Sequence, residues 1–202
     1  ERGIAMAKLL YQGHGSYRIT SEKGTVIYVD PFAGEGYDEE ADLVLVTHEH
    51  HDHNALHLVR MKEDGRVLRA AGMLEEGRYQ TRILGDISVH AVPAYNKNHD
   101  RDACVGYLIG VDHKVIYAAG DTSTTDFMGK LAAEHVDYAL LPIDGVYNMD
   151  ETEASACAKL IGARHTIPVH MKPGALFDRE KAEAFEAEGR LILEPGQAIE
   201  LT

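Results

Sequence analysis

Between residues 46 and 54 the chain reads Val46-Thr47-His48-Glu49-His50-His51-Asp52-His53-Asn54, which places four histidines and one aspartate within six positions. The apolar run from Leu43 to Val46 comes directly before them and is typical of a buried strand. Imidazole nitrogens and carboxylate oxygens are the ligands that divalent zinc, iron and manganese prefer, and a site with an open position activates water near neutral pH. The stretch therefore predicts a metal site at the end of a strand, in a metal-dependent hydrolase.

A solvated histidine-rich loop that binds metal only adventitiously is the alternative interpretation. Ligand-type residues elsewhere in the chain argue against it, because Asp30, Asp121 and His170 each follow another predicted strand directly or within a few residues. Side chains at the ends of neighbouring strands can converge on one edge of a sheet, where loops leave room for ligands. We therefore expect a metal site that is assembled from several strands.

The apolar patterns predict many short strands first, followed by strands that alternate with helices. The clearest helix is Glu151 to Ile161, which Asp150 can cap and Gly162 can end. Shorter helices are expected around residues 55–59, through 127–132 and at 178–188. The expected strands are 8–11, 16–20, 25–30, 43–46, 66–70, 82–84, 87–92, 105–111, 114–118, 138–143, 165–169, 191–193 and 198–201.

This order of elements predicts a layered α/β fold in which helices cover the sheets from outside. A chain of 202 residues is most simply one domain, and we interpret residues 1–202 as one. Met6 is the expected native start, with residues 1–5 an expression remnant.

The formal net charge of -13 disfavours a nucleic-acid partner, because proteins that track phosphates need clustered Lys and Arg. Cys104 and Cys157 form no C-x-x-C pair, and the first residues are too polar for a signal peptide. We therefore expect a cytoplasmic protein without a membrane segment, acting on a small molecule. Two divalent ions would make the pocket locally positive, so that an anionic substrate fits. The sequence indicates no oligomeric state.

Three motifs resemble those of the metallo-β-lactamase superfamily. Residues 47–53 resemble its T-H-x-H-x-D-H signature, residues 119–122 its G-D-T motif, and residues 168–170 its final strand-end histidine. The resemblance extends from about Lys8 to Leu201 and implies a four-layer αββα sandwich with a two-metal site between the sheets. Residues 13–16, 92–96 and 141–143 resemble the small stand-alone branch akin to ascorbate-6-phosphate lactonase.

The resemblance also implies a role for each motif residue. His48 and His50 would hold one metal ion together with a third histidine, and Asp121 would bridge the two ions. Asp52, His53 and His170 would hold the second ion. The ions are most simply zinc, with manganese or iron as alternatives. A hydroxide shared by two cations is a strong nucleophile, and Asp52 is the expected catalytic residue that orients it or moves a proton.

The third histidine of the first metal is where the chain departs from the superfamily pattern. A ligand histidine commonly follows a Pro-Gly or Pro-Ala turn there, but this chain has Tyr95-Asn96. We favour His99, three residues further on, over His90, which lies inside a predicted strand. Two further hypotheses are that Asn96 is a weak ligand and that the site holds only one metal ion firmly.

Three more residues are candidates for supporting roles. Asp30 precedes Pro31 and either caps a loop or orients a ligand histidine from outside the ligand shell. His14, in a Gly-His-Gly turn, is either a surface residue or a donor at the edge of the site. Lys172, two residues after His170, is either exposed or meets an anionic substrate group.

The leading hypothesis is a di-metal hydrolase that opens an ester, lactone or phosphoester bond of a small molecule. A phosphodiesterase or nuclease on the same scaffold is the second hypothesis, although the scattered Lys and Arg offer no basic surface. A non-hydrolytic metal protein, either a sensor or a di-iron redox domain, is the hypothesis from another class. Redox use would normally need a second cofactor domain to deliver electrons.

Overall fold

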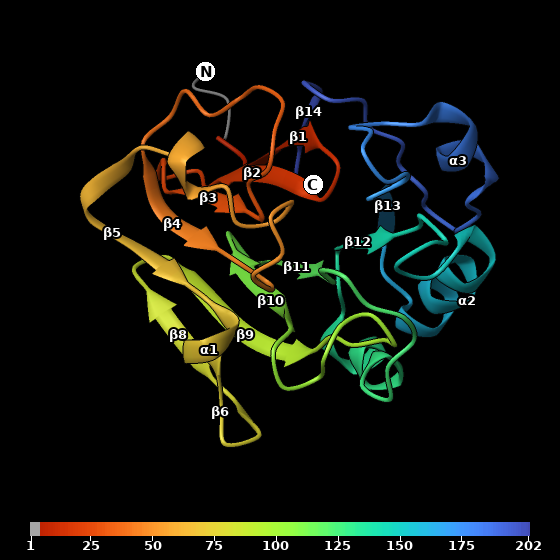
Figure 1. Cartoon of the computed structure of the whole chain (residues 1–202). Coiled ribbons are helices and arrows are strands. Elements are labelled where there is room, and N and C mark those ends of the chain that lie inside the picture. Colours follow the sequence, from red (N-terminus) through yellow and green to blue (C-terminus); the bar gives the residue numbers. More distant parts are fainter. Residues whose placement is uncertain (1–4) are drawn as a thin grey trace.

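A computed structural model describes residues 5–202, which form two six-stranded sheets that pack face to face (Figure 1). The layered α/β sandwich predicted from the order of elements is confirmed. The interpretation of residues 1–5 as an expression remnant rests mainly on residues 1–4, which lie outside the described residues.

The first sheet has the strand order β14-β1-β2-β3-β4-β5. Strands β14, β1, β2 and β3 pair antiparallel, whereas β3, β4 and β5 run parallel. The parallel part places the ends of β3 and β4 next to each other, and these strands precede Asp30 and the histidine-rich stretch. The strands are β1 (Lys8–Gly13), β2 (Ser16–Thr20), β3 (Val26–Val29), β4 (Ala41–Leu45), β5 (Met61–Leu68) and β14 (Ala198–Glu200).

The second sheet repeats this plan with the order β13-β12-β11-β10-β9-β8. Its first four strands in sequence pair antiparallel, and β11, β12 and β13 run parallel. A small hairpin of β6 (Leu74–Glu75) and β7 (Arg78–Tyr79) forms a separate two-stranded sheet, whose Leu74 and Tyr79 pack against the main core. The strands of the large sheet are β8 (Thr81–Leu84), β9 (Ile87–Pro93), β10 (Val105–Val111), β11 (Lys114–Ala118), β12 (Tyr138–Pro142) and β13 (His165–Val169).

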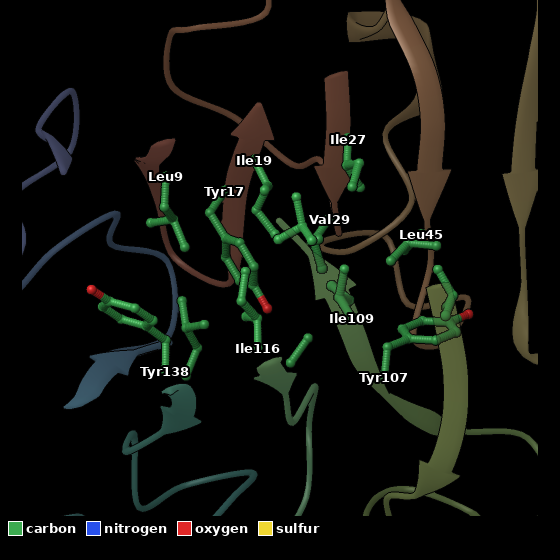
Figure 2. Packing of buried hydrophobic residues seen from close by; sticks show 14 of the residues in the cluster. Leu9, Tyr17, Ile19, Ile27, Val29, Leu45, Tyr107, Ile109, Ile116 and Tyr138 are labelled. Atoms are coloured by element: carbon green, nitrogen blue, oxygen red, sulfur yellow. The ribbon is translucent and has the colours of Figure 1, made fainter. Parts of the chain in front are cut away.

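The main core fills the space between the two sheets (Figure 2). Leu43 and Leu45 point into this core, while Val44 and Val46 belong to a cluster on the outer face of the first sheet. This alternation is the period of a strand, and it confirms that the run before the histidines is covered on both faces. The buried Tyr107 hydroxyl donates to the Val46 carbonyl at 2.7 Å, which ties the second sheet to the start of the histidine-rich stretch.

The outer layers differ in thickness. Helices α2 (Glu151–Ile161) and α3 (Arg179–Ala184) and a 3₁₀ helix at Met128–Glu134 lie on the outer face of the second sheet. The first sheet is covered by loop 31–40 and by a 3₁₀ helix at Leu56–Leu58. A single-turn helix, α1 (Ala70–Met73), follows β5.

Helix α2 has the bounds that the sequence predicts. The Asp150 carboxylate accepts a hydrogen bond from the Glu153 backbone N–H, and Gly162 ends the helix in the left-handed conformation. The buried residues of this helix fall at the predicted spacing. They are Ala154, Cys157, Ala158 and Ile161.

Other expected elements are shorter or absent. The expected helices at 55–59 and 127–132 are 3₁₀ helices, and the one at 178–188 ends at Ala184. The expected strand at 191–193 does not form, because only Arg190 bridges Thr166 in β13. Strand β5 begins five residues earlier than predicted and ends at Leu68. In the described part of the chain, no helix is long and apolar enough to cross a membrane.

Candidate metal centre

The candidate metal centre lies where strands from both sheets end. His14 lies in the turn between β1 and β2, Asp30 follows β3, and His48 lies three residues after the end of β4. From the second sheet, the loop after β9 supplies His99, the segment after β11 supplies Asp121, and His170 directly follows β13. The structure therefore brings together residues that are up to 156 positions apart in the sequence (14 to 170).

The ligand-type side chains form two groups of four, within each of which one ligand atom per residue lies within 4.8 Å of the others, and a third group of Asp30, His48 and His53 overlaps both. The first ligand group consists of His48, His50, His99 and Asp121, and the second consists of His14, Asp52, His53 and His170. Both groups meet at one atom of Asp121. Its Oδ2 lies 3.0 Å from His99 Nε2, and 3.3 Å from both His53 Nε2 and His170 Nε2. This central position matches the bridging role that the resemblance implies.

Several atoms of the centre are suited to a cation because they are buried and unpaired. His48 Nε2, His53 Nε2, His170 Nε2 and Asp121 Oδ1 have no hydrogen-bond partner among the described residues. Leaving such atoms unpaired costs about 1–3 kcal/mol each, which coordination to a metal ion would offset. The donor set of imidazoles and carboxylates also fits zinc, iron or manganese.

Asp30 orients a histidine of each group, His53 by direct contact and His48 through Thr47. Its carboxylate accepts from the Thr47 backbone N–H at 2.8 Å, from the Thr47 hydroxyl at 2.6 Å and from His53 Nδ1 at 2.8 Å. Because the Thr47 hydroxyl donates to Asp30, its oxygen accepts from His48 Nδ1 at 2.9 Å. Both histidines thus turn Nε2 toward the centre. The structure favours the orienting role of Asp30 over a simple loop cap.

The backbone around the centre adopts unusual conformations. Asp30, His14 and His170 all have positive φ, at 45°, 53° and 47°. Such conformations cost energy for residues other than glycine and persist where the surrounding contacts fix them, often at functional sites. Gly120 (φ 67°) precedes Asp121, and a side chain there would meet Thr47 Cβ at 2.9 Å.

His14 lies inside the second ligand group and is buried, so it is not a surface residue. Its Nε2 is 2.7 Å from Asp52 Oδ2, and its ring packs against that of His170 at a centroid distance of 3.8 Å. The neighbouring Gly15 leaves room for the His53 ring, because a Cβ at Gly15 would lie 3.2 Å from that ring. His14 is therefore a fourth candidate ligand or a direct partner of Asp52.

His99, and not His90, reaches the centre. His99 is buried beside Asp121, whereas His90 is exposed on β9 and contacts the Thr81 hydroxyl at 2.8 Å. Asn96 contacts His99 Nδ1 through its Oδ1 at 2.8 Å, as an orienting partner does. Lys172 is 63% exposed and lies 3.8 Å from Asp178, so its substrate role stays a prediction.

Asp144 is a supporting residue that the sequence analysis did not single out. Its buried side chain follows β12 and lies 3.3 Å from His170 Nδ1. Burial raises the pKa of Asp144, but contacts with His170, the Tyr147 N–H and Asn148 outweigh it and lower that pKa to about 2. The available signal was positional, since Asp144 follows an apolar strand as Asp30 does.

The charges of the centre follow from burial and from the neighbouring groups. Burial and repulsion from His53 lower the pKa of His48 to about 2, which keeps it a neutral ligand. Burial opposes ionisation of Asp121, but the imidazoles of His53 and His170 hold its pKa well below the usual range. Burial likewise opposes ionisation of Asp52, whose pKa is lowered by the hydrogen bond from His14 and by the nearby imidazoles of His170 and His53. Two carboxylates thus face the imidazoles as anions.

The centre opens into a cavity of about 360 Å³. Its floor consists of atoms from both ligand groups, and its rim carries Tyr147, whose side chain is 51% exposed. The cavity is lined by His50, His51, Asp52, Asn98, His99, Asp121, Tyr147 and His170. A small molecule in this cavity can reach both candidate metal positions.

Comparison with known proteins agrees with this geometry. Residues 8–170 match the family model described as a beta-lactamase superfamily domain. A UPF0173 metal-dependent hydrolase from Methanoregula boonei is 37% identical over 80% of this chain and 81% of its own length. A second relative of that name, from Thermococcus onnurineus, is 30% identical over 97% of this chain and 100% of its own length.

A solved structure extends the agreement to the whole fold. A metallo hydrolase from the archaeon Ignicoccus hospitalis superposes with a TM-score of 0.76 over 96% of this chain and 97% of its own, at 24% identity. This likeness shows a shared fold. The signature motifs, the two ligand groups and the relatives together establish that the chain is a metal-dependent hydrolase that belongs to the metallo-β-lactamase superfamily.

Proposed function

We propose that this hydrolase opens an ester, lactone or phosphoester bond of a small molecule with the help of two divalent metal ions. The observation that carries the proposal is the pair of ligand groups that share Asp121 and open into one cavity. His48, His50 and His99 would hold one ion, and Asp52, His53 and His170 the other, with Asp121 common to both. When bound, the two ions would supply an activated water and a Lewis acid at neutral pH.

Zinc is the ion that this donor set most simply suits, with manganese or iron as alternatives. Three imidazoles beside one carboxylate in the first group resemble sites that hold zinc with an open position. The buried histidine nitrogens without hydrogen-bond partners support the proposal.

Asp52 is the proposed catalytic residue. It is the carboxylate of the second group that is 20% exposed and lines the cavity, so it can touch a substrate. Its Oδ2 is 2.7 Å from His14 Nε2, and that hydrogen bond would hold the carboxylate in one orientation. Asp52 would orient the attacking water and carry its proton toward the leaving group.

The cavity volume and the net charge support a small substrate. About 360 Å³ accommodates a metabolite-sized molecule, and a net charge of -13 is unfavourable for binding along a nucleic acid. Positive ions in the cavity would favour an anionic group on the substrate. We also propose a cytoplasmic location, in keeping with the two free cysteines.

The test is metal analysis of protein purified without chelator or affinity tag. Inductively coupled plasma mass spectrometry should find about two transition-metal ions per chain, and fewer in His48→Ala and His99→Ala. His90→Ala is the matched control, because its side chain is exposed and outside the centre. Folded wild-type protein that contains no metal as purified, and binds none when zinc, manganese or iron is added, would refute the two-ion proposal. A panel of lactones, esters and phosphodiesters, assayed with the ion found, then tests the bond type.

A further inference from the structure

Four contacts link a histidine of the first ligand group to one of the second. His99 Nδ1 lies 2.8 Å from Asn96 Oδ1, and Asn96 Nδ2 lies 3.0 Å from Asn148 Oδ1. Asn148 Nδ2 then lies 2.9 Å from Asp144 Oδ1, which is 3.3 Å from His170 Nδ1. The last contact is at ion-pair distance without hydrogen-bond alignment, and it is the weakest of the four. We call this series the Asn148 chain.

The backbone fixes the direction of the Asn148 chain. The Asn98 backbone N–H can only donate, and it lies 2.9 Å from Asn96 Oδ1, so that atom is an acceptor. His99 Nδ1 must therefore donate to it. Asn96 Nδ2 also donates to the Tyr147 carbonyl at 3.0 Å, which agrees with this orientation. Asn148 then accepts from Asn96 and donates to the carboxylate of Asp144.

The direction of these hydrogen bonds matters because it determines which nitrogen of each histidine ring carries no proton and can bind a metal ion. A histidine that donates from Nδ1 keeps its Nε2 lone pair for a metal ion. At the far end the Asp144 carboxylate lies 3.3 Å from His170 Nδ1, and beside that anion only a protonated Nδ1 is favourable. Both rings are thereby held in the tautomer that suits coordination.

Asn148 is the central member and is itself buried. The three residues before it, 145–147, are exposed, including Tyr147 at the rim of the cavity. Asp144 also binds this loop, since its Oδ2 accepts from the Tyr147 N–H at 2.8 Å. The buried Asn148 amide accepts a hydrogen bond from Asn96 and donates one to Asp144. It thereby connects the cavity rim at Tyr147 with both ligand groups.

We propose that Asn148 is a positioning residue that couples the two metal positions through this chain. The inference rests on the metal centre of the proposed function. It differs from a merely structural role for Asn148 in holding the loop, because it requires that a change at the His99 end alter metal binding at the His170 end.

The first test breaks the Asn148 chain at Asn96 and keeps a hydrogen-bond acceptor for His99. In Asn96→Asp the carboxylate still accepts from His99 but no longer donates to Asn148. Asn98→Asp is the matched control, because it adds the same charge nearby, and among the described residues the Asn98 side chain hydrogen-bonds only to the Tyr147 carbonyl. Zinc titration of chelator-stripped protein, followed at the ring resonances of His99 and His170, should show about tenfold weaker binding at the His170 position in Asn96→Asp alone. Equal effects in the two variants would overturn the coupling.

The second test needs no metal. Long-range ¹H–¹⁵N spectra of metal-free protein report which ring nitrogen carries the proton. Wild type should show Nδ1–H for both His99 and His170, and Asn148→Leu should change the ring shifts of both. A change at one ring or at neither would refute the coupling. Asn148→Asp, which accepts from Asn96 but cannot donate to Asp144, replaces Asn148→Leu if that variant does not fold.

The two tests separate the inference from the proposed function. Wild-type protein that binds no zinc refutes the metal centre, whereas the metal-free spectra still test the hydrogen bonds. Wild-type protein that binds two zinc ions, with unchanged spectra in Asn148→Leu, keeps the proposed function and refutes the role of Asn148.

Discussion

The two ligand groups share Asp121 but are supported by different chemistry. In the first group, His48 contacts the Thr47 hydroxyl and His99 contacts the Asn96 amide, which are neutral partners. In the second group, His53 contacts the Asp30 carboxylate and His170 lies beside that of Asp144. The first group also includes an exposed histidine, His50, and the imidazoles of the second group are buried.

Because of this difference, one centre can combine a metal position that holds its ion tightly with one that is more accessible. Burial opposes protonation of His53 and His170, but Asp121 and further carboxylates raise the pKa of both well above the ordinary value. Carboxylate partners make an imidazole a stronger ligand. We therefore expect the second position to hold its ion more tightly, and the first position to exchange more readily.

The largest effect is expected when Asp121, which the two ligand groups share, is replaced. Asp121→Ala should abolish tight binding at both positions and lower kcat by at least about 10³-fold, because both ions and the activated water depend on this carboxylate. Metal analysis and turnover on the best substrate of the panel measure the effect. Circular dichroism controls for folding. Retention of one full equivalent would mean that Asp121 belongs to one position alone.

The next effect separates chemistry from binding within the second group. Asp52→Asn keeps the shape of the side chain and loses the proton-accepting oxygen, so kcat should fall about 10²- to 10⁴-fold. Substrate binding in the same cavity should change little. Steady-state kinetics on metal-saturated protein measure both. Unchanged turnover at full metal occupancy would assign Asp52 to coordination only.

A paired substitution tests the different supports directly. Asp30→Asn should weaken metal binding by about 10- to 100-fold, since it replaces the carboxylate behind His53. Thr47→Val removes the neutral partner of His48 and one donor to Asp30, and it should cost less, with the larger loss at the first position. Competition with a fluorescent chelator gives both affinities. A larger loss in Thr47→Val than in Asp30→Asn would reverse the comparison.

The smallest effect concerns pH and uses metal-free protein. The folded-state pKa of His48 is lowered to about 2, so below the ordinary value of 6.5 the unfolded chain binds a proton that the folded chain does not. The stability that His48 contributes is therefore lost as pH falls. Relative to His48→Gln, wild type should lose about 1 kcal/mol between pH 7.5 and 5.5.

His53 should behave in the opposite way. Its folded-state pKa is raised, so its contribution is fully present below pH 6.5 and is lost as pH rises through the raised pKa. Urea unfolding of wild type, His48→Gln and His53→Gln at several pH values gives both difference curves. Parallel curves would show that the two groups do not differ electrostatically.

Part of the fold could be predicted because its signals are local. Helix α2 was predicted to the residue, since cap, apolar spacing and terminal glycine lie within 13 consecutive positions, 150–162. The expected helices at 127–132 and 178–188 were less accurate, because propensity does not distinguish a 3₁₀ helix or a short turn from a longer α-helix. The expected strand at 191–193 does not form, because only Arg190 bridges a neighbouring strand. Sequence alone does not show which strands lie side by side.

By itself the sequence determined the superfamily and the chemistry of the centre. The stretch from His48 to His53 supplies four of the seven proposed ligand residues within six positions, and Asp121 and His170 follow their own strands. These features depend on residue type and spacing, so the sequence alone shows them.

Only the tertiary structure decided which of the remaining polar residues support the centre. His99 was chosen over His90 by its place beside Asp121, and the parts of Asp144 and Asn148 emerged only when β9, β12 and β13 brought their loops together. The reason is that a hydrogen bond depends on atoms within about 3 Å, and residues distant in sequence reach that distance only through the packing of the sheets.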